Sequence, residues 1–208
     1  MASLPTKALL GSASAVGVGG ATFAGVKALN NYEYIESKIK SSLLIKKESD
    51  DKWNARLTWL KDSNKAKEDQ ITDDLKELRK KSNVSVDDLK RWCSDSLRSK
   101  FVDKTDTRFK NVKVLCTLNI GDQISTGKLT SESQKSDSKI TSLFGKLSNK
   151  QQSELSPEMW AVKNTADAST DHKGNEALKT LCLSSYEIPF EEENDPKFLE
   201  VKEYCVTT

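Results

Sequence analysis

The chain has almost no histidine: His172 is the only one among its 208 residues. A Ser-His or Cys-His catalytic pair would have to use His172, which lies in the polar stretch TDHKGN. The sequence also lacks the CxxC motif that zinc knuckles and thioredoxin-like redox sites use. These two absences disfavour histidine-based catalysis, a structural zinc ion and redox chemistry at cysteine.

A strong excess of charge of either sign is missing as well. The chain carries 33 basic and 31 acidic residues, a net charge of +2, which gives no indication of a nucleic-acid-binding surface. The segment from Gly121 to Lys128 is not a phosphate-binding loop, because Leu129 stands where the magnesium-binding Ser or Thr belongs. The acidic run that starts at Glu191 lacks the ligand spacing and the glycine of an EF-hand. We therefore predict no enzyme, no cofactor, no metal ion and no small-molecule substrate.

What the chain does have is one segment that occurs twice. Residues 89–116 and 178–205 align without a gap at an offset of 89, and 10 of the 28 positions are identical. Chance would give about two identities at ordinary residue frequencies. The identical positions include all four cysteines, and they are Leu89/Leu178, Lys90/Lys179, Cys93/Cys182, Ser96/Ser185, Phe101/Phe190, Asp106/Asp195, Phe109/Phe198, Val112/Val201, Lys113/Lys202 and Cys116/Cys205.

Each copy has the pattern of two helices joined by a loop. Apolar residues recur four apart in the first part of each copy, and three or four apart in the second part, which is one face of a helix. Asp106 and Asp195 precede the second helices and are predicted to cap them, because Asp is a strong N-cap residue. Between Val112 and Ile120 the apolar residues also alternate, so a strand is an alternative for this copy.

An antiparallel pair of helices would bring Cys93 near Cys116, and Cys182 near Cys205. Four cysteines allow three pairings, and the duplication selects this one. Each disulfide would stabilise the fold by roughly 3 kcal/mol, chiefly by restricting the unfolded chain. The alternatives are four buried free thiols that pack as small hydrophobic groups, and a zinc site made from all four cysteines.

Near the N-terminus, 19 residues from Ala8 to Val26 carry no charge. A helix of this length spans nearly the thickness of a hydrocarbon core. Its small residues recur four apart, a pattern that lets membrane helices approach closely. We predict a signal anchor, with a cleaved signal peptide and a soluble glycine-rich tail as alternatives. The flanking charges do not fix an orientation, but the cysteines favour an extracellular C-terminal body.

The predicted fold is mainly α-helical, with a single N-terminal transmembrane helix and a duplicated small helical domain. Residues 1–31 form the anchor or signal segment, 32–118 the first helical half, 119–139 a polar linker and 140–208 the second half. The linker is rich in Ser, Lys and Asp. Beyond it, the helix that leads to Trp160 is interpreted as the counterpart of the helix that contains Trp53, and Ile140 as the counterpart of Ile39.

The paired pattern LKxxC…F…FxxVxxxC follows a stretch of small apolar residues and a helix with Trp and Arg. In these features the chain resembles a family of paralogous proteins that haemotrophic mycoplasmas carry in many copies and that have no assigned activity. The resemblance implies a membrane-anchored or exported protein of a wall-less bacterium that lives on red blood cells. It also implies a role in surface variation and host contact.

We therefore expect a membrane-anchored surface protein with a host-interaction or antigenic-variation role and no catalytic activity. Its expected partners are the cell membrane, through the N-terminal segment, and a host-cell surface protein. An intracellular helical scaffold with free thiols, either tethered to the membrane or soluble, is the alternative.

Overall fold

The structure is a computed structural model that describes residues 32–39, 43–44, 50–165 and 171–207. In these ranges the regular secondary structure is helical, and β pairing is confined to isolated bridges, so the predicted mainly α-helical class is confirmed. The α-helices and 3-10 turns are α1 (Ile35–Lys38), α2 (Asp50–Lys61), η2 (Glu68–Gln70), α3 (Asp73–Lys80), α4 (Val86–Leu97), α5 (Thr107–Cys116), α6 (Ile120–Gln123), α7 (Ser138–Gly145), η3 (Gln152–Glu154), α8 (Pro157–Lys163), α9 (Lys173–Ser185) and α10 (Pro196–Tyr204).

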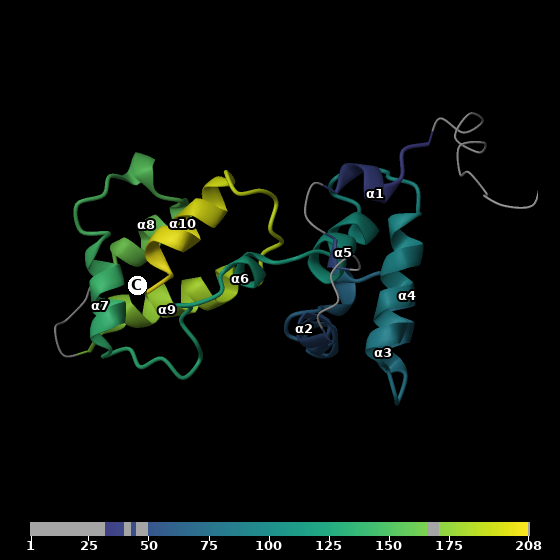
Figure 1. The fold of residues 1–208 in the computed structure, drawn as a ribbon, viewed down its shortest axis with the longest axis horizontal. Helices are drawn as coiled ribbons and strands as arrows, with labels where there is room; N and C mark the ends of the chain where they lie inside the picture. The colour runs from purple at the N-terminus through teal and green to yellow at the C-terminus, as the bar shows by residue number, and fades with distance from the viewer. Residues whose placement is uncertain (1–31, 40–42, 45–49, 166–170, 208) are drawn as a thin grey trace, which may run out of the picture. The chain divides into compact units, whose positions relative to one another are not determined.

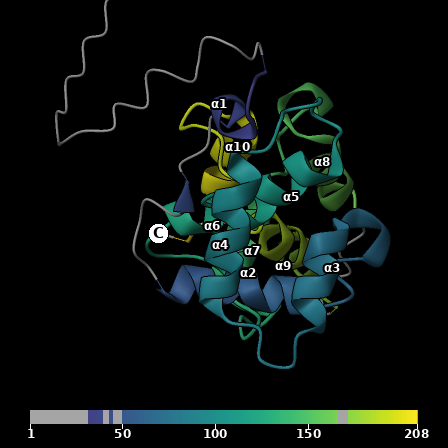
Figure 2. The same ribbon diagram turned by 90° about the vertical axis from the view of Figure 1, so that its right-hand side faces the viewer.

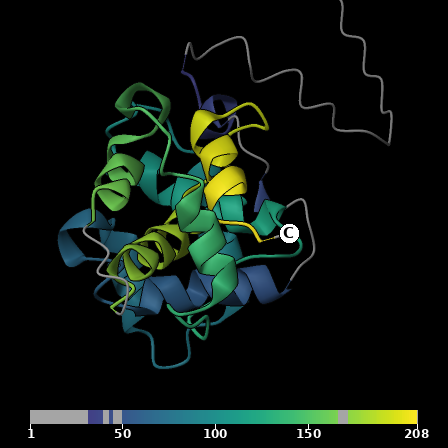
Figure 3. The same cartoon turned by 90° about the vertical axis from the view of Figure 1, so that its left-hand side faces the viewer.

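The described part of the chain has two hydrophobic cores. The first gathers the buried side chains of α1 to α5 and ends at Leu118, and the second begins at Ile120 and gathers those of α6 to α10. Each core is surrounded by its own set of helices (Figure 1). Figure 2 faces the helices of the first core, and Figure 3 faces those of the second. Two small cores replace one large one, as expected for a duplicated chain.

The second half repeats the first half element by element. We call residues 33–117 the first half and residues 118–206 the second half. The order α1, α2, η2, α3, α4, α5 recurs as α6, α7, η3, α8, α9, α10. Buried side chains occupy equivalent positions in the two series, and they include Ile35/Ile120, Trp53/Ile140, Leu60/Leu147, Ile71/Leu155, Leu75/Met159, Leu78/Val162, Leu89/Leu178, Phe109/Phe198 and Val112/Val201.

The β bridges repeat in the same way. The segment before α1 pairs antiparallel with the loop of the first hairpin at Tyr34 and Lys100, and Asn119 pairs with Pro189 at the equivalent positions. The hydrogen bonds also match: the Phe101 N–H donates to a carbonyl before α1 at 2.8 Å, and the Phe190 N–H donates to one before α6 at 2.8 Å. The duplication therefore covers whole halves rather than the two hairpins alone.

Polar contacts recur at equivalent positions even where the residue type differs. The Thr72 N–H before α3 donates to Asn111 Oδ1 of α5 at 3.0 Å. In the second half the Ser156 N–H donates to Glu200 Oε1 of α10 at 2.7 Å. The Asn111 amide in one half and the Glu200 carboxylate in the other thus accept hydrogen bonds from equivalent N–H groups that have no partner within their own helix.

Residues 119–139 are not a linker along their whole length. Ile120, Ile124 and Leu129 are buried in the second core, so the first part of this segment belongs to the second half. The prediction followed the polar composition, but three correctly spaced apolar side chains are enough to hold the segment against the core. Residues 130–137 are largely exposed, as a polar surface segment should be.

The helix that leads to Trp160 is also placed differently from the sequence interpretation. The counterpart of α2 is α7, because Trp53 and Ile140 take equivalent buried positions, and the counterpart of α8 is α3. The alternative of a strand between Val112 and Ile120 is wrong up to Cys116, where helix α5 ends.

The predicted transmembrane helix between Ala8 and Val26 lies outside the described residues. Within the part of the chain that the structure describes, no helix combines the length and the apolar character needed to cross a lipid bilayer.

Candidate functional site

The four cysteines form two disulfides, each of which closes one hairpin. Cys93 of α4 is bonded to Cys116 of α5 with a Cα–Cα distance of 5.6 Å, and Cys182 of α9 to Cys205 with 5.4 Å. These distances are typical of disulfides, and all four side chains are fully buried. The pairs are those that the duplication predicts. They leave no free cysteine for a zinc site or for thiol chemistry.

Asp106 and Asp195 lie at the N-caps of α5 and α10, as predicted. The Asp106 carboxylate accepts the Phe109 N–H at 2.9 Å, and the Asp195 carboxylate accepts the Phe198 N–H at 3.0 Å. In both halves the capped phenylalanine makes an edge-to-face contact with the aromatic residue of the hairpin loop, at centroid distances of 5.1 and 4.8 Å. The caps therefore fix the start of the helix that carries the second cysteine of each hairpin.

We expect Asp106→Ala to lower the free energy of unfolding by about 1 kcal/mol, because a helix N–H loses its acceptor. The same change at Asp195 should cost less, since Pro196 holds the first turn of α10 and Thr107 occupies that position in α5. Urea denaturation followed by tryptophan fluorescence measures both. Asp→Asn variants are the controls, because Asn keeps the acceptor and should cost less than Ala. Unchanged midpoints in both Ala variants would show that these carboxylates do not support the helices.

The described residues offer no cluster of three or more His, Cys, Asp or Glu side chains that could bind a metal ion. His172 lies at the start of α9 with φ 48°, in the left-handed region, between the ion-paired Asp171 and Lys173. The left-handed backbone at His172 turns the chain into the first turn of α9. Among the described residues, no serine, threonine or cysteine side chain is hydrogen-bonded to the His172 ring.

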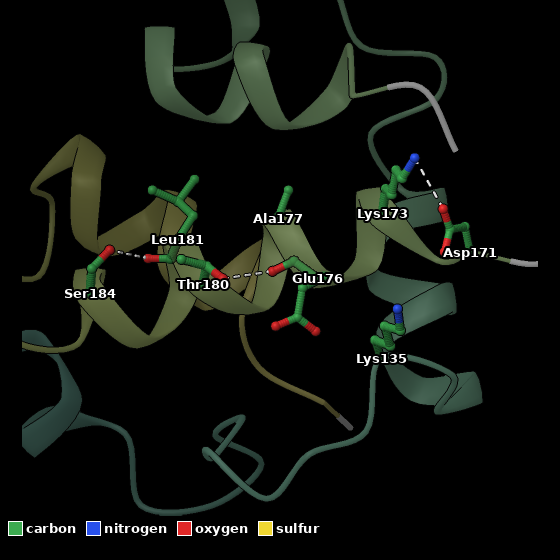
Figure 4. A pocket seen from close by; sticks show the side chains of 8 residues that line it. All are labelled: Lys135, Asp171, Lys173, Glu176, Ala177, Thr180, Leu181 and Ser184. Carbon is green, nitrogen blue, oxygen red and sulfur yellow. Dashed lines mark hydrogen bonds and ion pairs between the residues drawn. The ribbon is translucent and has the colours of Figure 1, made fainter. Parts of the chain in front are cut away.

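A hollow of about 550 Å³ lies along α9, lined by Lys135, Asp171, Lys173, Glu176, Ala177, Thr180, Leu181 and Ser184. Its two hydroxyl groups are hydrogen-bonded within the helix (Figure 4): the Thr180 hydroxyl donates to Glu176 O and the Ser184 hydroxyl to Leu181 O, both at 2.9 Å. Lys173 pairs with Asp171 at 3.0 Å. The hollow is an open helix surface, and its side chains do not converge on a reacting atom.

The most buried charged contact in the described structure joins the two halves. The Arg56 guanidinium of α2 pairs with Asp122 of α6, and their side chains are only 6% and 15% exposed. The same guanidinium nitrogen donates to Thr117 O at 3.2 Å, and Asp122 also accepts the Asn119 N–H at 2.8 Å. Arg56 Nε is buried and has no hydrogen-bond partner among the described residues. We call this set of residues the junction.

Two further charge pairs cross between the halves. Lys65 pairs with Glu187, and Lys113 pairs with Glu191. In all three pairs the first half supplies the cation and the second half supplies the anion. A groove of about 270 Å³ beside them is lined by Ala55, Arg56, Thr58, Trp59, Asp62, Lys65, Val114, Asn119 and Glu187. The charges therefore fix how one half docks on the other.

The junction was not predicted from the sequence. Asp122 lies in the segment interpreted as a linker, and Arg56 lies in a helix where arginine is ordinarily solvent-exposed. One signal was present: Asn119 and Asp122 have the spacing of a capping box, which marks the start of a helix within the supposed linker.

Comparison with known proteins adds no relative from which a site could be transferred. The chain matches no family model, no curated protein and no solved structure.

Proposed function

We propose that the protein is a membrane-anchored surface protein that makes contacts outside the cell and has no catalytic activity of its own. The observation that carries the proposal is the pair of buried disulfides, one in each half. Disulfides form and persist in oxidising environments and are rare in the cytosol. The disulfides of Cys93, Cys116, Cys182 and Cys205 therefore support an extracellular position of residues 33–206.

The N-terminal sequence supports the anchoring part of the proposal. The uncharged stretch from Ala8 to Val26 has the length of a transmembrane helix, and we propose that it forms a single one. The resemblance to the surface-exposed paralogues of haemotrophic mycoplasmas points in the same direction and favours a host-cell surface protein as the partner. A duplicated body of two small cores suits such a role, because it presents a large surface for few residues.

Brief protease treatment of intact cells tests the proposal. We expect the disulfide-closed body to be trimmed on intact cells, while a cytoplasmic marker protein in the same sample stays whole. Lysed cells are the control that shows the body to be cleavable. A body that is spared on intact cells and cleaved after lysis would place it inside and would favour the intracellular scaffold.

A further inference from the structure

The groove beside the junction is lined from both halves, and we call it the junction groove. It measures about 270 Å³ and lies between α2 with the turn after it, Val114 of α5, and Asn119 and Glu187 of the second half. Small-molecule sites occur preferentially where two domains meet. Such sites measure roughly 300–1,000 Å³ for drug-sized ligands, so the junction groove suits a smaller ligand, of about one ring.

Two buried polar side chains form the floor of the junction groove. Arg56 is 5% exposed and Asn119 is 6% exposed, whereas the other residues that line the groove are partly or fully exposed. Arg56 Nε and Asn119 Oδ1 are buried without a hydrogen-bond partner among the described residues. Buried polar atoms are nearly always satisfied, so a donor and an acceptor left over at the floor of one groove point to a group that binds there.

The two atoms set different requirements for that group. The Arg56 Nε–H needs an acceptor, and Asn119 Oδ1 needs a donor. A carboxylate or phosphate only accepts, and an ammonium group only donates, so each would leave one of the two atoms unsatisfied. A hydroxyl group both donates and accepts, and therefore a single hydroxyl can serve both atoms.

The walls of the junction groove include an aromatic ring that the fold itself does not require. Trp59 and Val114 line the groove and are partly buried. The equivalent positions of the second half carry Lys146 and Glu203, and both are exposed. The Trp59 indole presents a flat, electron-rich face, which suits the C–H groups on the face of a sugar ring.

The charges that line the junction groove balance. Its two cations are both paired, Arg56 with Asp122 and Lys65 with Glu187. Asp62 accepts the Asn64 N–H at 2.9 Å and remains open to a ligand at the edge of the groove. A charged ligand would find no unpaired counter-ion of excess sign and would lose its hydration without compensation. The groove therefore favours a neutral ligand that carries several hydroxyl groups.

We propose that the junction groove binds one pyranose ring of a neutral glycan, with a face of the ring on Trp59 and a hydroxyl group at Arg56 Nε and Asn119 Oδ1. The choice of a glycan as the ligand rests on the proposed function, because glycans cover the surfaces that a protein outside the cell contacts. The docking of the two halves then has a role beyond stability, since neither half alone provides the whole groove.

The test uses the purified full chain in a sugar-free detergent. The probes are the methyl pyranosides of galactose, mannose and N-acetylglucosamine, with anionic N-acetylneuraminic acid and cationic glucosamine as charged counterparts. Saturation-transfer NMR measures the binding of each probe. We expect at least one neutral pyranoside to bind, with the strongest saturation at the C–H protons of one ring face. In the wild type the indole N–H resonance of Trp59 should shift during the titration, and that of Trp160 should not.

The decisive variant is Trp59→Lys, which introduces the residue type of the equivalent position in α7. We expect it to weaken binding of the sugar by at least about tenfold, as loss of an aromatic anchor does. The matched control is Trp160→Lys, which changes another partly buried tryptophan, in the second half, and should leave the affinity unchanged. Protected backbone amides in α2 and α4 show that the Trp59→Lys variant is folded.

The other outcomes overturn the inference in distinguishable ways. Binding of no neutral pyranoside, with the Trp59 resonance unmoved, would leave water as the partner of the two buried atoms. An unchanged affinity in folded Trp59→Lys would place the sugar elsewhere on the chain, and stronger binding of either charged probe would contradict a neutral ligand. The proposed function fails separately: sugar binding by the purified chain, together with a body spared by protease on intact cells, would keep the site and exclude a glycan outside the cell.

Discussion

Replacement of Cys93 and Cys116 together by alanine is expected to lower the free energy of unfolding of the first half by about 3 kcal/mol. The disulfide closes a chain segment with a sequence separation of 23, and its removal returns that loop's conformational entropy to the unfolded state. The Cys182→Ala/Cys205→Ala variant should lose a similar amount, because its disulfide has the same sequence separation of 23. Urea denaturation of each variant, with the wild type beside it, measures the change.

The two double variants are matched controls for each other, because each should destabilise mainly its own half. Hydrogen exchange of α4 and α5 should accelerate in the first variant, and exchange of α9 and α10 in the second. A decrease in unfolding free energy below about 1 kcal/mol in both variants would be no larger than the cost of losing one helix cap. It would mean that the disulfides do not stabilise the hairpins.

Replacement of Arg56 by leucine is expected to cost about 3 kcal/mol, even though leucine suits the helix and the core. Without the Arg56 guanidinium, the Asp122 carboxylate remains at a largely buried position with no cation beside it. Removing one partner of a buried ion pair is strongly destabilising. Leucine is the informative choice because Leu143 occupies the equivalent position in α7 and is buried there. The free energy of unfolding from urea denaturation gives the cost.

The control is the double variant Arg56→Leu/Asp122→Asn, which removes both charges and keeps an acceptor for the Asn119 N–H. We expect it to be more stable than Arg56→Leu alone, because no unpaired charge remains buried. The Lys65→Ala variant provides a comparison at an exposed pair, where the change should be within about 1 kcal/mol. The Asp122→Asn single variant completes the double-mutant cycle. Additive costs of the two single changes would show that Arg56 and Asp122 do not interact as described.

The features that the sequence predicted are local or repeated. The N-caps depend on one side chain and an N–H three residues later, so Asp106 and Asp195 could be read from spacing alone. The disulfide pairing depends on contacts between helices, yet it could be predicted because Cys93 and Cys116 recur at the same offset as Cys182 and Cys205.

The rest could not be predicted because equivalent positions carry different residues. Trp53 and Ile140 are both buried, but they share no identity by which α2 and α7 could be aligned. Asn111 and Glu200 satisfy the same helix donor with different side chains. The burial of Arg56 follows from the docking of the second half, which no local pattern encodes.

Peptide mass mapping under non-reducing conditions reports the disulfide pairing of the native protein directly. Intact cells would be quenched in acid, free thiols alkylated at once, and the full chain digested without reduction. We expect two disulfide-linked products, Cys93–Cys116 and Cys182–Cys205, and no alkylated cysteine. Disulfides between the halves would contradict the closing of each hairpin by its own disulfide. Four alkylated thiols would contradict both the closed hairpins and an oxidising environment for the body.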